Sequence, residues 1–153
     1  MLIGAGFERV FEIAPAFRAE PSDTVRHITE FTSLDAEVAS IEGAEELREM
    51  LEAILREAIE SARTTLTERA NPWGEALVPP QLPLPRISFA SAESDFGRPG
   101  ADRDLTTEEE KRLAESVKER TGSAWFFLTD FPTAIKQGTF YARRRDDRPR
   151  RTG

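Results

Sequence analysis

The 153-residue sequence contains no cysteine and only one histidine, His27. Without thiols the chain forms no disulfide, no zinc–thiolate site and no cysteine nucleophile. With one histidine it cannot surround a metal ion with imidazoles. A chain without disulfides is compatible with a reducing compartment, and we expect a cytoplasmic protein.

Long hydrophobic runs are also missing. No apolar run approaches the roughly 20 residues that a membrane-spanning helix requires. The first residues, MLIGAGFERVFE, lack the basic start of a secretory signal. We therefore expect no membrane partner.

Positive charge is scarce over most of the chain. The net charge is −7 and the isoelectric point is about 4.9, so an electrostatic grip on nucleic acid over the whole surface is not expected. Basic residues gather in the last segment, ARRRDDRPRRTG, and we predict a disordered basic tail over residues 146–153. The remaining composition, 39% hydrophobic and 32% charged, is typical of one globular domain.

Two alternating segments near the N-terminus predict a β-hairpin over residues 9–39. Arg9–Phe17 alternates partly, with Pro15 indicating an irregularity or a position that donates no ladder bond. Turn residues fill Ala19–Thr24, and His27–Ala39 alternates again.

A helix is predicted next, over residues 43–70. Its apolar residues recur every three or four positions, so we expect this stripe to pack in a core and the helix to cover one face of the sheet. Acidic residues fill its first half, where they suit the positive end of the helix dipole. They are Glu45, Glu46, Glu49 and Glu52. Five prolines over residues 71–85 then predict an irregular excursion.

The last third is predicted to contain a second helix and short strands. Arg86–Ala90 is either a short strand or the lead into a short helix, and Ser94–Asp104 is a loop rich in Gly, Asp and Ser. Thr106 or Thr107, followed by glutamates, suits the N-cap of a helix over residues 106–120 that stops at Gly122. Strands are expected within residues 124–143.

The hairpin carries residues suited to a nucleoside triphosphate. Arg18, at the end of the first strand, offers a planar fork for phosphate and carboxylate oxygens, and Glu20 lies on the same face of an extended chain. Arg26 and His27 can reach the distal phosphates across the loop, and Phe31 offers a flat surface to a base. Taken singly, each has an ordinary alternative: a surface ion pair, a solvated loop residue or a core phenylalanine. Their order and spacing together favour a site.

GFERVFEIAPAFRAE followed by TVRHITEFTSLDAE resembles motif 2 of the class II aminoacyl-tRNA synthetases, in the archaeal-type aspartyl- and asparaginyl- branch. The resemblance continues less strongly through LPRISFASA and DLTTEEEKRLAESVKERTGSAWFFLTDFPTAIKQGTFYARR, and so covers residues 3 to about 145.

The resemblance implies roles for individual residues. Arg18 would bridge the α-phosphate of ATP and the substrate carboxylate, and Glu20 would meet the adenine end. Phe31 would stack on adenine. Arg26, His27 and the backbone of Ile28 would lie along the phosphates.

Tyr141 would approach the amino-acid pocket. The branch commonly places a basic residue and proline before the Phe-Tyr pair, whereas this chain has Lys136-Gln137-Gly138-Thr139 there. The register of Tyr141 therefore differs from the usual pattern.

The fold implied is α+β, a partial class II synthetase antiparallel β-sheet with flanking helices, in which residues 1–145 form the central part of the catalytic domain. Motif 1, motif 3, the anticodon-binding domain and the ligands of the Mg²⁺ that accompanies ATP would lie outside this sequence. We therefore expect a chain of marginal stability that works with the missing segments, a complementing chain or a second copy.

The resemblance implies activation of aspartate or asparagine with ATP and transfer to tRNA. The residues that separate aspartate from asparagine would also lie outside the chain. Two alternatives stay open: an asparagine-synthetase-like enzyme that uses ammonia in place of tRNA, and a non-catalytic interaction module.

Overall fold

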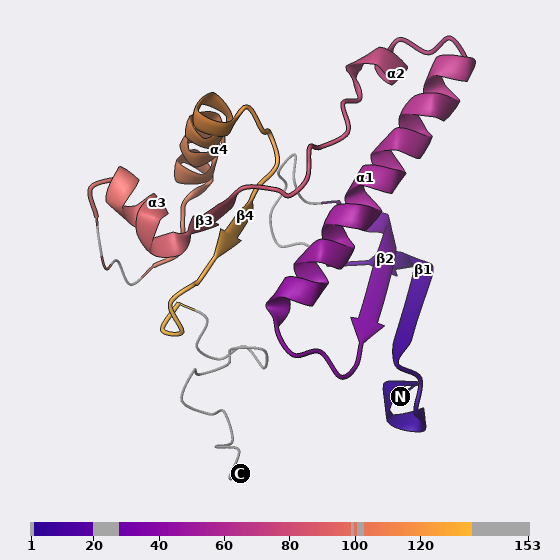
Figure 1. Cartoon of the computed structure of the whole chain (residues 1–153), viewed down its shortest axis with the longest axis horizontal. Helices are drawn as coiled ribbons and strands as arrows, with labels where there is room; N and C mark the ends of the chain where they lie inside the picture. The colour runs from indigo at the N-terminus through magenta and orange to yellow at the C-terminus, as the bar shows by residue number, and fades with distance from the viewer. Residues whose placement is uncertain (1, 20–27, 99, 101–102, 136–153) are drawn as a thin grey trace. The chain divides into compact units, whose positions relative to one another are not determined.

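The computed structural model describes residues 2–19, 28–98, 100 and 103–135 (Figure 1). The chain divides into two compact units, Met1–Leu51 and Glu52–Gly153. Tyr141, the strand expected over Thr139–Arg143 and the tail over 146–153 lie outside the described residues. In the part of the chain that is described, no helix is long and apolar enough to cross a membrane.

The first unit contains a short 3-10 helix, η1 (Ile3–Ala5), and an antiparallel hairpin of β1 (Arg9–Phe17) and β2 (Glu30–Val38). The register runs without a shift from Arg9 opposite Val38 to Phe17 opposite Glu30. The predicted hairpin is therefore confirmed. Its return strand is shorter than expected, and Pro15 causes no irregularity, because it pairs opposite Thr32 in the unbroken register.

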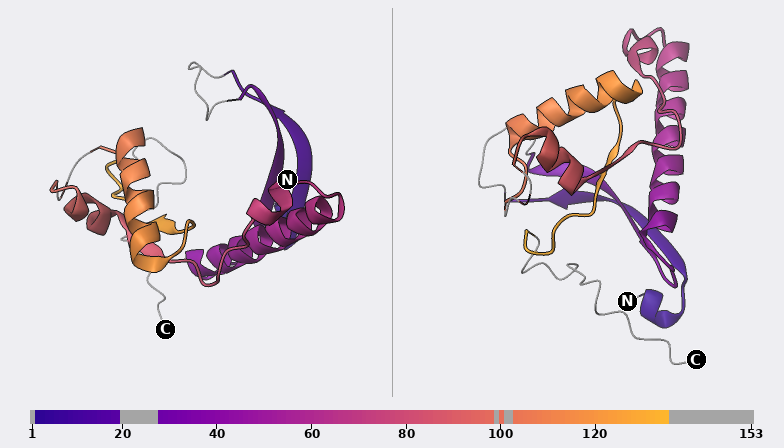
Figure 2. Two further views of the ribbon diagram at one scale, coloured as in Figure 1. Left: turned by 90° about the horizontal axis from the view of Figure 1, so that it is seen from above. Right: turned by 60° about the vertical axis from the view of Figure 1, so that its left-hand side comes forward.

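The hairpin is twisted (Figure 2), and its two faces carry different side chains. Since side chains alternate along a strand, the odd-numbered residues of β1 share a face with the even-numbered residues of β2. This face carries large apolar side chains that are more than half exposed: Phe11, Ile13, Phe17 and Leu34. The opposite face carries small and charged residues together with Val10 and Phe31, and no residue of either strand is fully buried.

The predicted long helix is α1 (Ala44–Glu68). Glu45 and Glu46 occupy its first turn, as expected from the dipole. The expected burial of its apolar stripe is found only in part. Leu47 and Leu51 are exposed, whereas Ile54, Leu55, Ile59 and Leu66 are half-buried. Glu52 is the one fully buried residue of the helix. Among the described residues, the buried apolar cluster forms around the later helix Thr107–Thr121 and not around α1.

Glu52 ties the helix to the proline-rich segment. Its side chain is 5% exposed, and Oε1 accepts a hydrogen bond of 2.9 Å from the backbone N–H of Leu84. Glu52, expected from the sequence to suit the helix dipole, therefore has a buried structural role as well. A buried backbone N–H without an acceptor would destabilise the fold by about 1–3 kcal/mol, and the carboxylate of Glu52 avoids this loss by accepting from Leu84.

The proline-rich segment is irregular over most of its length, as predicted, but begins with a four-residue helix, α2 (Trp73–Ala76). Gly74 allows α2 to approach the end of α1. A Cβ atom at this position would lie 2.7 Å from Oγ1 and 2.8 Å from the backbone N of Thr67. No side chain larger than hydrogen fits without a shift of the backbone.

The remaining elements are β3 (Arg86–Ser88), α3 (Phe89–Asp95), α4 (Thr107–Thr121) and β4 (Phe127–Thr129). Both readings of Arg86–Ala90 are therefore correct, since a strand leads directly into a helix. The expected loop over Ser94–Asp104 starts later, because α3 extends to Asp95. Ser88 caps α3 by accepting from the N–H of Ser91.

Strands β3 and β4 pair in parallel, with Ile87 opposite Leu128, which the sequence did not predict. The strand expected at Ala124–Leu128 begins three residues later, at Phe127, and ends at Thr129. The residues from Asp130 to Ile135 are not strand. β4 is this short because its partner β3 has three residues before α3 begins.

The core of the second unit lies where α3 and α4 meet this strand pair. Ala92 of α3 and Leu113 and Val117 of α4 are buried together. The apolar side chains packed against them are Ile87, Phe96, Leu105, Phe126 and Leu128. Phe89 is also fully buried, with its ring centroid 4.9 Å from that of Phe131.

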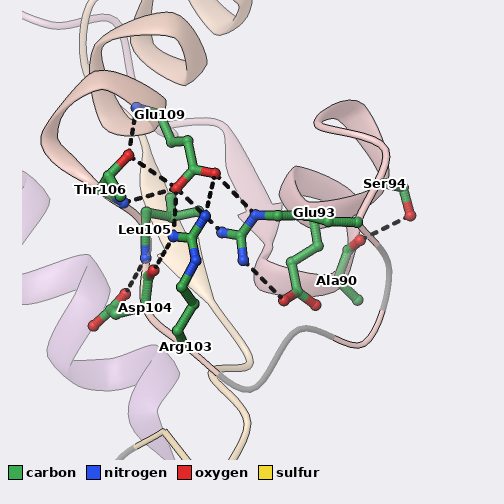
Figure 3. Close-up of polar contacts among 9 residues, drawn as sticks. Ala90, Glu93, Ser94, Arg103, Asp104, Leu105, Thr106 and Glu109 are labelled. Carbon is green, nitrogen blue, oxygen red and sulfur yellow. Dashed lines mark hydrogen bonds and ion pairs between the residues drawn. The ribbon is translucent and has the colours of Figure 1, made fainter.

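A carboxylate fixes the start of α4 (Figure 3). Thr106 and Glu109 form the predicted capping box, and Glu109 also accepts from both Nη atoms of Arg103 at 2.8 and 2.9 Å. Nε of Arg98 lies 3.0 Å from Oε1 of the same carboxylate. The hydrogen bonds from Arg103 and from the backbone of Thr106 lower the pKa of Glu109 well below its usual value.

Candidate functional site

The structure brings together two of the residues predicted to form a site, Arg18 and Phe31. Arg18 directly follows β1, and its backbone N–H donates to the carbonyl of Thr29 at 2.9 Å, which continues the hairpin register by one pair. Phe31 is the second residue of β2 and pairs with Ala16. Arg18 and Phe31 therefore project from the same face of the hairpin.

The guanidinium of Arg18 lies over the ring of Phe31, with Cζ 5.6 Å from the ring centroid. This is the geometry of a cation–π interaction. Phe31 is half-buried and Arg18 is exposed, so the guanidinium is accessible to a ligand. The ordinary alternative for Phe31, a buried core residue, is not what the structure shows.

The remaining predicted residues are only partly placed. Ile28 is described and exposed, and it lies just before the start of β2, where its backbone was expected to meet phosphates. Glu20, Arg26, His27 and Tyr141 lie outside the described residues. Their proximity to Arg18 stays a prediction.

A pair of acidic residues on the same face was missed by the sequence analysis. Glu12 and Asp35 lie directly opposite each other across the two strands. Like charges at such positions destabilise a hairpin, and natural sequences break local rules of this kind mostly at functional sites. The hairpin register reveals this pair. Partner residues have numbers that sum to 47, and Glu12 and Asp35 form the one pair in which both partners are acidic.

Small side chains separate the acidic pair from Arg18 and Phe31. Ala14 pairs with Ser33, and Ala16 pairs with Phe31. The face therefore has a guanidinium and an aromatic ring at one end, two carboxylates towards the other end, and small side chains between them. A surface of this kind can hold a flat ligand that carries both negative and positive groups.

The acidic pair on this face is too small to form a metal site by itself. Within the described ranges, no three His, Cys, Asp or Glu side chains lie close enough together to hold a metal ion. Glu12 and Asp35 supply two carboxylates, and the Mg²⁺ that accompanies a nucleotide is usually held by one or two carboxylates together with phosphate oxygens and water. The described residues therefore form no cation site of their own.

Known proteins resemble this chain over nearly its whole length. The family model described as tRNA synthetases class II (D, K and N) matches residues 1–152. Among curated proteins, an aspartate–tRNA(Asp) ligase of Thermococcus kodakarensis is 34% identical over 97% of this chain and 34% of its own length. An aspartate–tRNA(Asp/Asn) ligase of Thermus thermophilus is 38% identical over 85% of this chain and 32% of its own.

Solved structures show the same similarity. The aspartyl-tRNA synthetase of Entamoeba histolytica superposes with a TM-score of 0.73 at 29% identity, over 88% of this chain and 29% of its own. An asparaginyl-tRNA synthetase of the same organism, in complex with asparaginyl-adenylate, superposes with a TM-score of 0.66 at 25% identity, over 86% of this chain and 31% of its own. The chain spans about a third of the length of the curated relatives it matches.

Proposed function

Since this chain belongs to the class II tRNA synthetases of the D, K and N type, we propose that it contributes the motif 2 half of a site that activates aspartate or asparagine with ATP for transfer to tRNA. The observation that carries the proposal is the pairing of Arg18 with Phe31 on one accessible face of the hairpin. The names of the relatives, aspartate and asparagine ligases of tRNA, support the substrate class.

The reaction explains why an arginine is needed at this position. A carboxylate oxygen of the amino acid attacks the α-phosphorus of ATP, the bond to the bridging oxygen breaks, and pyrophosphate leaves with the electron pair. The attack brings two anions together. A guanidinium that donates to both the α-phosphate and the carboxylate offsets their repulsion and stabilises the charge that develops between them.

Arg18 can fulfil this role because its backbone belongs to the hydrogen-bonded ladder of the hairpin. The backbone hydrogen bond of Arg18 to Thr29 fixes the start of its side chain at the end of the two-stranded ladder. Phe31 would stack on the adenine ring of ATP. Glu20 would accept from the adenine amino group, and Arg26, His27 and the backbone of Ile28 would lie along the phosphates.

The amino acid would be held between the two charged ends of the face. Its carboxylate would meet Arg18, and its ammonium group suits the negative field of Glu12 and Asp35. Tyr141 would complete the pocket. The rest of the clamp around ATP, and the contacts to tRNA, would come from segments other than these 153 residues.

The relatives and solved neighbours do not favour the asparagine-synthetase-like alternative, since those reported above are tRNA ligases or synthetases by name. An interaction module without catalysis would not need the accessible guanidinium of Arg18. The test is therefore directed at this residue.

Calorimetric titration of ATP into the full chain tests the binding half of the proposal. Arg18→Ala removes charge-assisted hydrogen bonds worth about 1.5–3 kcal/mol, so the dissociation constant should rise by about 10- to 150-fold. Arg9→Ala is the matched control, because Arg9 projects from the opposite face of the same strand. Equal, weak affinity in wild type and Arg18→Ala would count against a nucleotide site.

Pyrophosphate exchange tests the catalytic half. The full chain is mixed with polypeptides that carry the remaining catalytic-domain segments of the Thermococcus kodakarensis relative, and exchange into ATP is measured with aspartate and with asparagine. We expect exchange with one of the two amino acids and its loss in Arg18→Ala. No exchange with either amino acid would overturn the assignment.

A further inference from the structure

We propose that Arg18 and adenine compete for the ring of Phe31, so that binding of the base releases the Arg18 guanidinium for the phosphates and the amino acid. This rests on the proposed function, because it takes the ATP site of the hairpin as given. It adds a positioning role for Phe31: the ring holds Arg18 in place until the nucleotide arrives.

The hairpin geometry creates this competition. Phe31 lies opposite Ala16, and Arg18 is two residues farther along the same face. Alanine is too short to cover the ring, so the side chain that reaches it is the diagonal one, Arg18, with Cζ 5.6 Å from the centroid. Phe31 is half-buried. The guanidinium thus occupies ring surface that a stacking base would need.

The energies favour displacement by the base. A cation–π contact at an exposed position is worth about 0.5–1 kcal/mol. Stacking of a nucleic-acid base on an aromatic side chain is worth about 1–3 kcal/mol. Adenine therefore replaces the guanidinium on the ring, and Arg18 regains its binding energy by donating to phosphate oxygens.

The arrangement makes base and phosphate recognition interdependent. A ligand with phosphates but no base must pull Arg18 away from Phe31 and receives no stacking in return. A ligand with both parts exchanges one ring contact for another. The site therefore discriminates against free polyphosphate, including the pyrophosphate that the reaction releases.

Affinity measurements on the full chain should show that loss of the Phe31 ring changes the affinities for tripolyphosphate and for ATP in opposite directions. Phe31→Leu removes the ring, so inorganic tripolyphosphate should bind about two- to fivefold more tightly, which is the lost cation–π energy expressed as a ratio. ATP should bind more weakly in the same variant, because it loses its stacking partner. Damage to the fold would weaken both ligands, and Phe17→Leu, an exposed aromatic residue on the opposite face, should change neither.

NMR on the same proteins observes the exchange directly. In the free chain the Nε–Hε and δ-proton resonances of Arg18 should show a ring-current shift that Phe31→Leu abolishes and Phe17→Leu leaves intact. Adenosine, which has no phosphate, should move these resonances of the wild type towards their positions in Phe31→Leu.

The outcomes separate this proposal from the proposed function. If ATP binds but Phe31→Leu leaves the free-state Arg18 resonances unchanged, or adenosine binds without moving them, the competition is overturned and the nucleotide site stands. If tripolyphosphate binds no more tightly to Phe31→Leu, the competition is equally overturned. If neither ATP nor adenosine binds the wild type, both proposals fail.

Discussion

The hairpin and the α3–α4 region use apolar residues in opposite ways. In the hairpin, Phe11 is 75% exposed and no residue of β1 or β2 is fully buried. In the second unit, Phe89, Ala92 and Val117 have no exposed surface. The candidate site lies on the region with regular strands but no core, and the buried core lies in the region to which no function is assigned.

This difference shows what each region depends on. The two-stranded ladder is held by backbone hydrogen bonds and cross-strand pairs, and an isolated hairpin of this kind is marginally stable. The α3–α4 region gains its stability from buried apolar area and a capped helix. Side chains on the hairpin can therefore be chosen for chemistry, whereas those at the α3–α4 contact are constrained by packing.

The largest expected effect comes from a matched pair of leucines. Leu113 is 2% exposed in the core and Leu34 is 51% exposed on the hairpin. Leu113→Ala should destabilise the second unit by about 2–5 kcal/mol, because it leaves a cavity. Urea unfolding followed by the fluorescence of Trp73 and Trp125 measures this.

Leu34→Ala should leave that transition within about 0.5 kcal/mol of wild type. An equal loss in both variants would show that the hairpin face is covered in solution. The contrast between the two regions would then be wrong.

An intermediate effect is expected at Glu109. Because Arg103 and Thr106 lower the pKa of this carboxyl in the folded protein, its stabilising effect is fully present above the unfolded-state value of about 4.3 and is lost as the pH falls through the lower folded value. At neutral pH, Glu109→Gln should lower the melting temperature more than Thr106→Ala, which removes the two hydrogen bonds of the threonine hydroxyl but leaves those between Glu109 and Arg103. As the pH falls below about 4, the difference in melting temperature between wild type and Glu109→Gln should shrink.

Glu108→Gln serves as the control for this series, since Glu108 is an exposed neighbour in the same first turn. Its melting temperature should follow that of wild type at every pH. A pH-independent deficit in Glu109→Gln would mean that shape, rather than charge, fixes the start of α4.

The smallest effect is expected within the hairpin and has the opposite sign. Glu12→Thr removes the repulsion between Glu12 and Asp35 and should stabilise the hairpin by about 0.2–1 kcal/mol. Amide hydrogen exchange of β1 and β2 is the measurement, and the gain should decrease at high salt.

Glu30→Thr is the comparison variant, because Glu30 lies opposite the uncharged Phe17. If both variants protect the hairpin equally, threonine propensity explains the gain. The Glu12–Asp35 pair would then carry no special cost.

The sequence predicted the elements better than their environments. Alternation located the hairpin, and the Thr106–Glu109 spacing located the start of α4. The three- and four-residue periodicity in α1 was correct for the helix but only partly correct for its burial, because periodicity reports which residues share a face and not whether another element covers that face. The parallel pairing of β3 with β4 joins residues 41 positions apart, and no local pattern encodes it.

Arg18 and Phe31 illustrate the same limit at the candidate site. The amino-acid order alone determined which residues are chemically suited to ATP, since a guanidinium and an aromatic ring keep their properties wherever they lie. It did not determine the register of the hairpin, because alternation assigns residues to the faces of each strand and not to partners across the two strands. Only the tertiary structure decided that the Arg18 guanidinium lies over the Phe31 ring and that Glu12 lies opposite Asp35. It also decided that Glu52 is buried and accepts a hydrogen bond from the backbone of Leu84. These are contacts between residues 13 to 32 positions apart, and their energies depend on distance and solvent access, which only the folded chain sets.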